Sequence, residues 1–123
     1  MGLNLSAPAV PLTILLPVYN DWESAALVLD QLDRVLAGHQ TAVNAVLVDD
    51  ASDQPPPRPL LARPPARLTR IEVLRLRRNL GHQRAIAIGL SWLQAERDPD
   101  TVVVMDADGE DEPGDVPRLL ERF

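Results

Sequence analysis

The chain alternates short apolar runs with longer segments in which apolar residues recur every three or four positions. The short runs contain many β-branched residues, which is typical of strands buried on both faces. They are Leu12–Val18, Ala45–Val48, Ile71–Leu76 and Thr101–Met105. The longer segments follow the period of an amphipathic helix; they are Trp22–Ala37, Gly81–Glu96 and a last one beginning near Asp115. Because strands alternate with helices, the pattern predicts an α/β fold, an open and mostly parallel sheet with helices on both faces.

Local signals mark the ends of the predicted helices. Asn20 or Asp21 is suited to cap the start of the first helix, and Gly38 is suited to end it. In the second helix, Gly89 lies close to the apolar stripe and permits a close approach to the layer beneath.

The connection after the second strand is rich in proline. The segment Gln54–Arg67 holds six of the twelve prolines in the chain, so it is predicted to be an extended, polyproline-like loop without regular helix. Such a segment is more often a stiff connection than a ligand for a proline-binding module.

Composition limits the possible functions. At 123 residues with 46% hydrophobic content, the chain suits a single domain. The formal net charge of −6 argues against a protein that binds nucleic acid through its phosphates. The absence of cysteine excludes disulfides and thiolate metal sites, and no apolar run is long enough to span a membrane.

Polar residues collect where three of the predicted strands end. The first strand ends in PVYND, the second in VDDASD, and the fourth in DADGEDE, which packs five carboxylates into seven positions. Sites in open parallel sheets gather at the carboxyl ends of the strands, so these residues are expected to meet. Carboxylates brought together in this way repel each other unless a cation or hydrogen-bond donors accompany them.

The acidic end of the fourth strand predicts a metal site. In an extended segment Asp106 and Asp108 point the same way, and Glu110 adds a third ligand if the chain turns at Gly109. Hard oxygen ligands suit Mg²⁺ or Mn²⁺, which keep positions open for substrate phosphates. The alternative is a solvated acidic loop that leads into a helix.

Two other kinds of acidic site fit this segment less well than a Mg²⁺ or Mn²⁺ site does. An EF-hand loop needs glycine at its sixth position and glutamate at its twelfth, but counting from Asp106 gives Asp111 and Pro117. A phosphorylated receiver domain needs a lysine, and all twelve basic residues here are arginines.

Four segments together resemble the N-terminal part of the family 2 inverting glycosyltransferases of GT-A fold, closest to the dolichyl-phosphate mannose synthase and polyprenyl-phosphate hexose transferase branch. The segments are LLPVYND, VLVDDASD, RNLGHQRAIAIGL and VVVMDADGEDEP, and they stand in the family's order from Leu12 to Pro113. The resemblance implies that residues 1–123 form one nucleotide-sugar-binding domain, a Rossmann-like GT-A half that is truncated on its C-terminal side.

The resemblance also implies roles for individual residues. Pro17, Tyr19 and Asp21 match a nucleotide-contacting motif that usually ends in glutamate, while Val48 and Asp50 match positions that contact the base, which suits uracil or guanine. The family's DxD element, which faces the sugar nucleotide and holds the divalent metal, is matched by Asp106, Ala107 and Asp108. Glu110 falls where many relatives carry glutamine as a further metal contact.

The segment after the third strand carries a weaker signal. Arg78, Asn79 and the turn at Gly81 are expected at the same edge of the sheet, where they could meet phosphate, although solvated charge explains the arginines equally well. His82 and His39 are expected to be polar residues at helix ends, because neither has a second ligand at metal spacing.

The implied function is transfer of a hexose from a nucleoside-diphosphate sugar to an acceptor, with a polyprenyl phosphate as the candidate acceptor and Mg²⁺ or Mn²⁺ stabilising the diphosphate leaving group. The expected location is the cytoplasm, including the cytosolic face of a membrane. The alternative is a non-catalytic module that binds a nucleotide or a cation. The family continues past the position of Phe123 with an acceptor-binding half, so the length of this chain favours that alternative, whereas the intact segments PVYND, DDASD and DADGE favour an enzyme.

Overall fold

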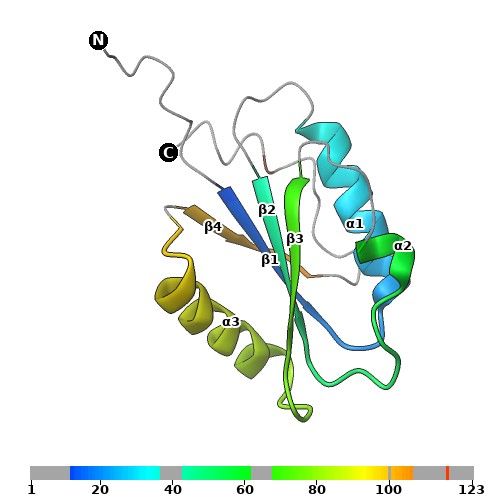
Figure 1. Cartoon of the computed structure of the whole chain (residues 1–123), viewed down its shortest axis with the longest axis vertical. Helices are drawn as coiled ribbons and strands as arrows, with labels where there is room; N and C mark the ends of the chain where they lie inside the picture. Colours follow the sequence, from blue (N-terminus) through cyan, green and yellow to red (C-terminus); the bar gives the residue numbers. More distant parts are fainter. Residues whose placement is uncertain (1–11, 37–42, 62–67, 100, 107–115, 117–123) are drawn as a thin grey trace.

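In the part of the chain that the structure describes, four parallel strands form a sheet in the order β3-β2-β1-β4. The computed structural model describes residues 12–36, 43–61, 68–99, 101–106 and 116 (Figure 1). The strands are β1 (Leu12–Val18), β2 (Val43–Asp49), β3 (Leu68–Arg75) and β4 (Thr101–Val104). The predicted α/β class and the parallel pairing are confirmed, although β2 and β3 begin two and three residues before their predicted starts.

Helices cover both faces of the sheet, as the alternation of elements predicted. Helices α1 (Trp22–Val35) and α2 (Arg58–Leu61) lie on one face, and α3 (His82–Glu96) lies on the other (Figure 1). Within the described residues, no helix is long and apolar enough to cross a membrane.

Strand β1 supplies both hydrophobic cores because successive side chains point to opposite faces of the sheet. Ile14 and Leu16 pack with α1, whereas Leu15 packs with the core beneath α3. All seven residues of β1 are buried, which explains why the strand reads as a continuous apolar run.

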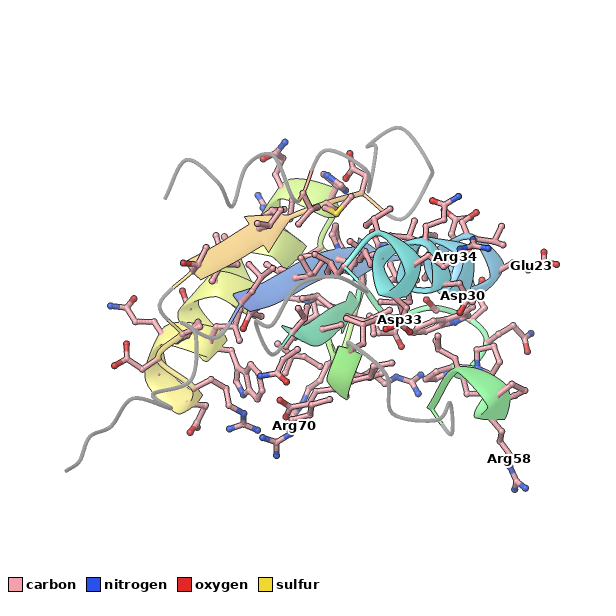
Figure 2. The ribbon with its side chains drawn as sticks, turned by 90° about the horizontal axis from the view of Figure 1, so that it is seen from above. Glu23, Asp30, Asp33, Arg34, Arg58 and Arg70 are labelled. Carbon is pink, nitrogen blue, oxygen red and sulfur yellow. The ribbon has the colours of Figure 1, made fainter. Side chains whose placement is uncertain are left out.

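The outer side of α1 carries its charged residues. Glu23, Asp30 and Arg34 lie on this helix and are exposed, and Figure 2 shows Arg58 extending away from α2. Asp33 is partly buried, and its Oδ1 accepts a hydrogen bond from the backbone N–H of Leu68 at 2.9 Å. That bond ties the helix to the start of β3.

The ends of α1 differ slightly from those predicted. Asp21 is the N-cap residue, as expected, but its side chain makes no capping hydrogen bond. The helix ends at Val35 with Leu36 as its C-cap, two residues earlier than predicted, and Gly38 lies outside the described residues.

The prediction that the proline-rich segment lacks regular helix is wrong for one turn. Helix α2 forms at Arg58–Leu61, with Leu60 N donating to the carbonyl of Pro57 at 3.1 Å. Proline is tolerated in a first helical turn because the N–H it lacks would have no partner there. Leu60 is buried in the core beneath α1, which gives the turn a reason to form. Residues 62–67 lie outside the described residues.

The strand order places a crevice at the carboxyl end of β1. The chain proceeds from β1 to β2 and β3 on one side and then crosses to β4 on the other side. Ligands of open α/β sheets bind at such a reversal of strand order, outside the carboxyl ends of the strands.

Candidate functional site

An open pocket of about 260 Å³ lies at this crevice. Its walls come from the ends of β1, β2 and β4 and from the start of α3. The lining residues are Pro17, Val18, Tyr19, Asp21, Asp50, Asn79, Gly81, His82 and Asp106. The prediction that polar strand ends gather at one edge of the sheet is therefore confirmed for the described residues.

Asp50 lies at the centre of the hydrogen bonding in the pocket. Asp50 is almost fully buried, with only 3% of the residue exposed. Oδ1 accepts from Leu80 N at 2.8 Å, and Oδ2 accepts from Gly81 N at 3.0 Å and from Asn79 Nδ2 at 3.1 Å. The carboxylate thus fixes the turn that leads into α3.

These three bonds leave Asp50 little capacity for a ligand. An ionised carboxylate has about four acceptor positions, two on each oxygen. Both positions on Oδ2 and one on Oδ1 are used within the protein. One position on Oδ1 remains, which is enough for a single N–H.

A second network joins the ends of β1 and β2. Asn20 N donates to Ser52 Oγ at 2.8 Å, and Asp53 N donates to Asn20 Oδ1 at 2.8 Å. Asn20 has a φ of 64°, a left-handed conformation that asparagine tolerates better than most residues. The network fixes the chain at Asn20, between Tyr19 and Asp21. The side chains of these two neighbours are exposed and line the pocket.

Asp106 enters the pocket from the end of β4. The backbone N–H of Met105 donates to the carbonyl of Leu15 at 2.9 Å and so continues the pairing of β4 with β1 past the last strand residue. Asp106 Oδ1 lies 2.8 Å from Nε2 of His82, the first residue of α3. The fourth strand and the third helix therefore meet through side chains at the pocket.

The structure brings together most of the described residues that the sequence singled out. Pro17, Tyr19, Asp21, Asp50 and Asp106 all line the pocket. Val48 does not line it, because its side chain is fully buried in the core beneath α3. Ala107, Asp108 and Glu110 lie outside the described residues.

Two contributions to the pocket were not predicted from the sequence. His82 was expected only as a polar residue at a helix start, and its contact with Asp106 was missed. Asn79 was expected only at this edge of the sheet, and the hydrogen bond that its side chain donates to Asp50 was missed. The sequence signal for both was their place directly after β3, at the edge of the sheet that carries the other polar ends.

The charge of the pocket suits a cation. Of the described residues, Asp21, Asp50, Asp106 and His82 line it, and no arginine of the described part of the chain does. Carboxylate oxygens are the donors that Mg²⁺ and Mn²⁺ prefer. Among the described residues, no three histidine, aspartate or glutamate side chains are placed to hold a metal ion together.

Comparison with known proteins points to one family of transferases. The family model described as glycosyl transferase family 2 matches residues 13–123. Similar proteins include the undecaprenyl-phosphate 4-deoxy-4-formamido-L-arabinose transferases of Klebsiella pneumoniae strain 342, 29% identical over 94% of this chain, and of Yersinia pestis strain Pestoides F, 29% identical over 96%. The transferase of the same description from Erwinia tasmaniensis is 31% identical over 89% of this chain. These alignments cover 34%, 35% and 32% of the relatives, so the chain spans about a third of their length.

Proposed function

The chain belongs to glycosyl transferase family 2, and from this premise we propose that it binds the nucleoside-diphosphate sugar in a transfer of hexose to a polyprenyl phosphate. The observation that carries the proposal is the pocket at the reversal of strand order, where Asp50 and Asp106 face one space from two strand ends. The acceptor is suggested by the relatives, which are undecaprenyl-phosphate transferases.

The residues on each wall of the pocket have a role in binding the donor in this proposal. The remaining acceptor position on Asp50 Oδ1 suits a ring N–H of uracil or guanine, and Pro17, Tyr19 and Asp21 border the nucleotide. Val48 supports this wall from within the core, because its side chain is fully buried.

The acidic end of β4 would hold Mg²⁺ or Mn²⁺. Asp106, Asp108 and Glu110 are the proposed ligands, and Ala107 stands between the two aspartates. A bound divalent ion supplies Lewis-acid stabilisation of the charge that develops on the diphosphate. The protein's own contribution is to orient the donor so that an acceptor oxygen reaches the sugar from the far side. A phosphate acceptor is already anionic, so this step needs no strong general base. A lipid-linked acceptor would place the reaction at the cytosolic face of a membrane.

A thermal-shift panel tests the binding part of the proposal. The chain is heated with UDP-, GDP- and dTDP-sugars, each with and without Mn²⁺. A ligand at a hundred times its dissociation constant adds about 2.7 kcal/mol to the free energy of unfolding. We expect one base to stabilise the chain strongly, and only when Mn²⁺ is present.

Two variants make the panel specific. Asp108→Asn should abolish the Mn²⁺-dependent part of the shift, whereas Glu96→Gln, which removes an exposed carboxylate at the far end of α3, should retain it. A shift of equal size without Mn²⁺ and in Asp108→Asn would contradict the proposed site.

The second candidate is a module that binds a nucleotide or a cation without turnover. It needs only the pocket at the strand ends, which the described residues form by themselves. Incubation with the stabilising donor and a polyprenyl phosphate separates the two. Formation of a glycosylated lipid supports the transferase, and a donor that binds but is never consumed supports the module.

A further inference from the structure

The turn between Tyr19 and Asp21 is held by hydrogen bonds to the segment that follows β2. Asn20 N donates to Ser52 Oγ at 2.8 Å, and Asp53 N donates to Asn20 Oδ1 at 2.8 Å. We propose that Asn20 and Ser52 are positioning residues, which keep the side chains of Tyr19 and Asp21 where nucleotide binding needs them. This inference rests on the proposed function, because it concerns the same pocket.

The side chains of Tyr19 and Asp21 are exposed towards a ligand. Both line the pocket, and Tyr19 is 47% exposed, so its ring offers a face on which a nucleotide base can stack. Asp21 is the N-cap residue of α1, and an aspartate at that position commonly bonds to a backbone N–H of the first turn. Here the carboxylate makes no capping hydrogen bond, although the backbone carbonyl of Asp21 accepts from Ala25 N at 2.9 Å. The carboxylate therefore stays at the pocket.

The side chain of Asn20 is directed away from the ligand. Asn20 is not among the described residues that line the pocket, and both ends of its amide bond to Asp53. Oδ1 accepts from Asp53 N at 2.8 Å, and Nδ2 lies 3.3 Å from Asp53 Oδ2. The backbone of Asn20 has a φ of 64°, and its N–H is bound by Ser52. Asn20 is thus held at its backbone and at its side chain, so its rotation would move the neighbours on each side.

Ser52 is itself anchored in the core. Only 3% of the residue is exposed, and its N–H donates to Oδ1 of the fully buried Asp49 at 2.8 Å. Asp50 N donates to the carbonyl of Val18 at 2.8 Å and so joins the ends of β1 and β2 beside this anchor. A run of hydrogen bonds therefore leads from a buried carboxylate through Ser52 to Asn20, between the two exposed side chains of the pocket.

The contacts between Asn20 and Asp53 are better explained by placement than by stability. They lie at the surface, where water can replace either partner after a substitution. A lost hydrogen bond is costly chiefly when it leaves a buried group without a partner. Glycine adopts a positive φ without strain, so Asn20→Gly should retain the turn and the fold while it removes the side-chain contacts.

Calorimetric titration of the 123-residue chain with UDP, GDP and dTDP, each with and without Mn²⁺, tests this role. For the nucleotide and condition that give the tightest wild-type binding, we expect Asn20→Gly to raise the dissociation constant about 5- to 10-fold, the equivalent of about one hydrogen bond. Asn20→Asp should recover most of the affinity, because its carboxylate can accept from Asp53 N and aspartate tolerates a left-handed backbone. Ser52→Ala, which removes the acceptor for Asn20 N, should weaken binding in the same direction.

Gln54→Ala is the matched control. Gln54 lies in the same segment, is exposed and is not among the described residues that line the pocket. Its backbone carbonyl, which accepts from Trp22 Nε1, is retained in the variant. Gln54→Ala should therefore bind the nucleotide as the wild type does.

A spectroscopic measurement without nucleotide reports the placement directly. Tyr19 is the only tyrosine in the chain, so incorporation of 3-fluorotyrosine labels this ring alone for ¹⁹F NMR. The resonance should shift and broaden in Asn20→Gly, return towards the wild-type position in Asn20→Asp, and stay unchanged in Gln54→Ala. A ¹⁹F signal of Asn20→Gly that matches the wild type in position and width would overturn the positioning role.

The outcomes separate this inference from the proposed function. If the wild type binds a nucleotide and Asn20→Gly binds it equally well, only the positioning role is overturned. The same holds if Asn20→Asp binds no better than Asn20→Gly, or if Gln54→Ala weakens binding as much. If the wild type binds none of the three nucleotides, the proposed function and the inference fall together. The two variants of Asn20 decide the test even if Ser52→Ala, at a buried position, does not fold.

Discussion

Gly89 controls how closely α3 approaches the sheet. A Cβ atom built at this position would lie 2.7 Å from Cγ2 of Val48 and 3.0 Å from Cδ1 of Leu15. Both neighbours are fully buried, so neither can turn out into solvent. We expect Gly89→Ala to push the helix away from β1 and β2, and with it the first turn that carries His82.

The magnitude follows from two opposing terms. Alanine is favoured over glycine inside a helix by about 1 kcal/mol. Overpacking of a filled core costs about 1–3 kcal/mol, and a valine cannot easily rotate away because its β-branch fixes χ1. Since 2.7 Å is closer than Cβ atoms approach in real proteins, the cost should lie in the upper part of that range. We expect a net loss of about 1–2 kcal/mol in the free energy of unfolding.

Equilibrium unfolding in urea, followed by tryptophan fluorescence, measures this loss. With an m-value of about 2 kcal/mol/M, the midpoint should fall by about 0.5–1 M. The loss of stability in Ala87→Gly measures the difference in helix propensity between alanine and glycine without a packing change, because Ala87 is exposed on the same helix. Adding that term to the loss in Gly89→Ala yields the packing cost.

A double variant identifies the source of the cost. Val48→Ala removes the nearest atom, so Gly89→Ala should be much less harmful in the Val48→Ala background than in the wild type. If Gly89→Ala leaves the midpoint unchanged or raises it, the close approach of α3 to the sheet is not a constraint and the reasoning is refuted.

Three other substitutions test contacts of the described residues. Asp50→Asn should destabilise the chain by about 1.5–3 kcal/mol in urea unfolding, because a charged acceptor of three N–H bonds is lost; an unchanged midpoint would contradict its anchoring role. Trp22→Phe should cost about 1 kcal/mol through loss of the 3.0 Å bond from Nε1 to the carbonyl of Gln54, and wild-type stability would show that this bond does not matter. Arg97 lowers the pKa of Glu72 from its ordinary value of 4.5, mainly through its hydrogen bonds. The folded chain therefore holds the Glu72 carboxylate more strongly than the unfolded chain does, so the small advantage over Glu72→Gln should be complete above about pH 5 and decline as the pH falls below 4.5. An advantage that grows towards low pH in thermal unfolding would reverse this sign.

The sequence was sufficient for the order of elements and for the edge that carries the site. Apolar runs buried on both faces and helices with one apolar stripe are direct consequences of where the side chains lie, so β1 and α1 could be located from their pattern. The one-turn helix α2 could not, because its stability comes from burial of Leu60 against a core that no local pattern reveals.

Partners of the acidic residues were also beyond prediction from the sequence. The segment VDDASD shows that carboxylates stand at the end of β2, but not which partners they find. Asp49 is fully buried, with Oδ1 accepting from Ser52 N and Arg75 Nε 4.0 Å from Oδ2. Asp50 reaches 30 residues along the chain to Leu80. Such contacts depend on the crossover that brings β3 beside β2, and the crossover is a property of the whole fold.

The acidic residues at the ends of β2 and β4 consequently have different roles. At the end of β2, the carboxylates of Asp49 and Asp50 are buried and accept hydrogen bonds from the backbone, so their charge serves mainly to fix loops. After β4, Asp106 is partly exposed in the pocket and meets the imidazole of His82. Bonds from the loop donors already fill most of Asp50, so this carboxylate has little capacity left for a ligand. The same sequence chemistry, an aspartate at the end of a parallel strand, thus builds the frame in one place and the candidate ligand in the other.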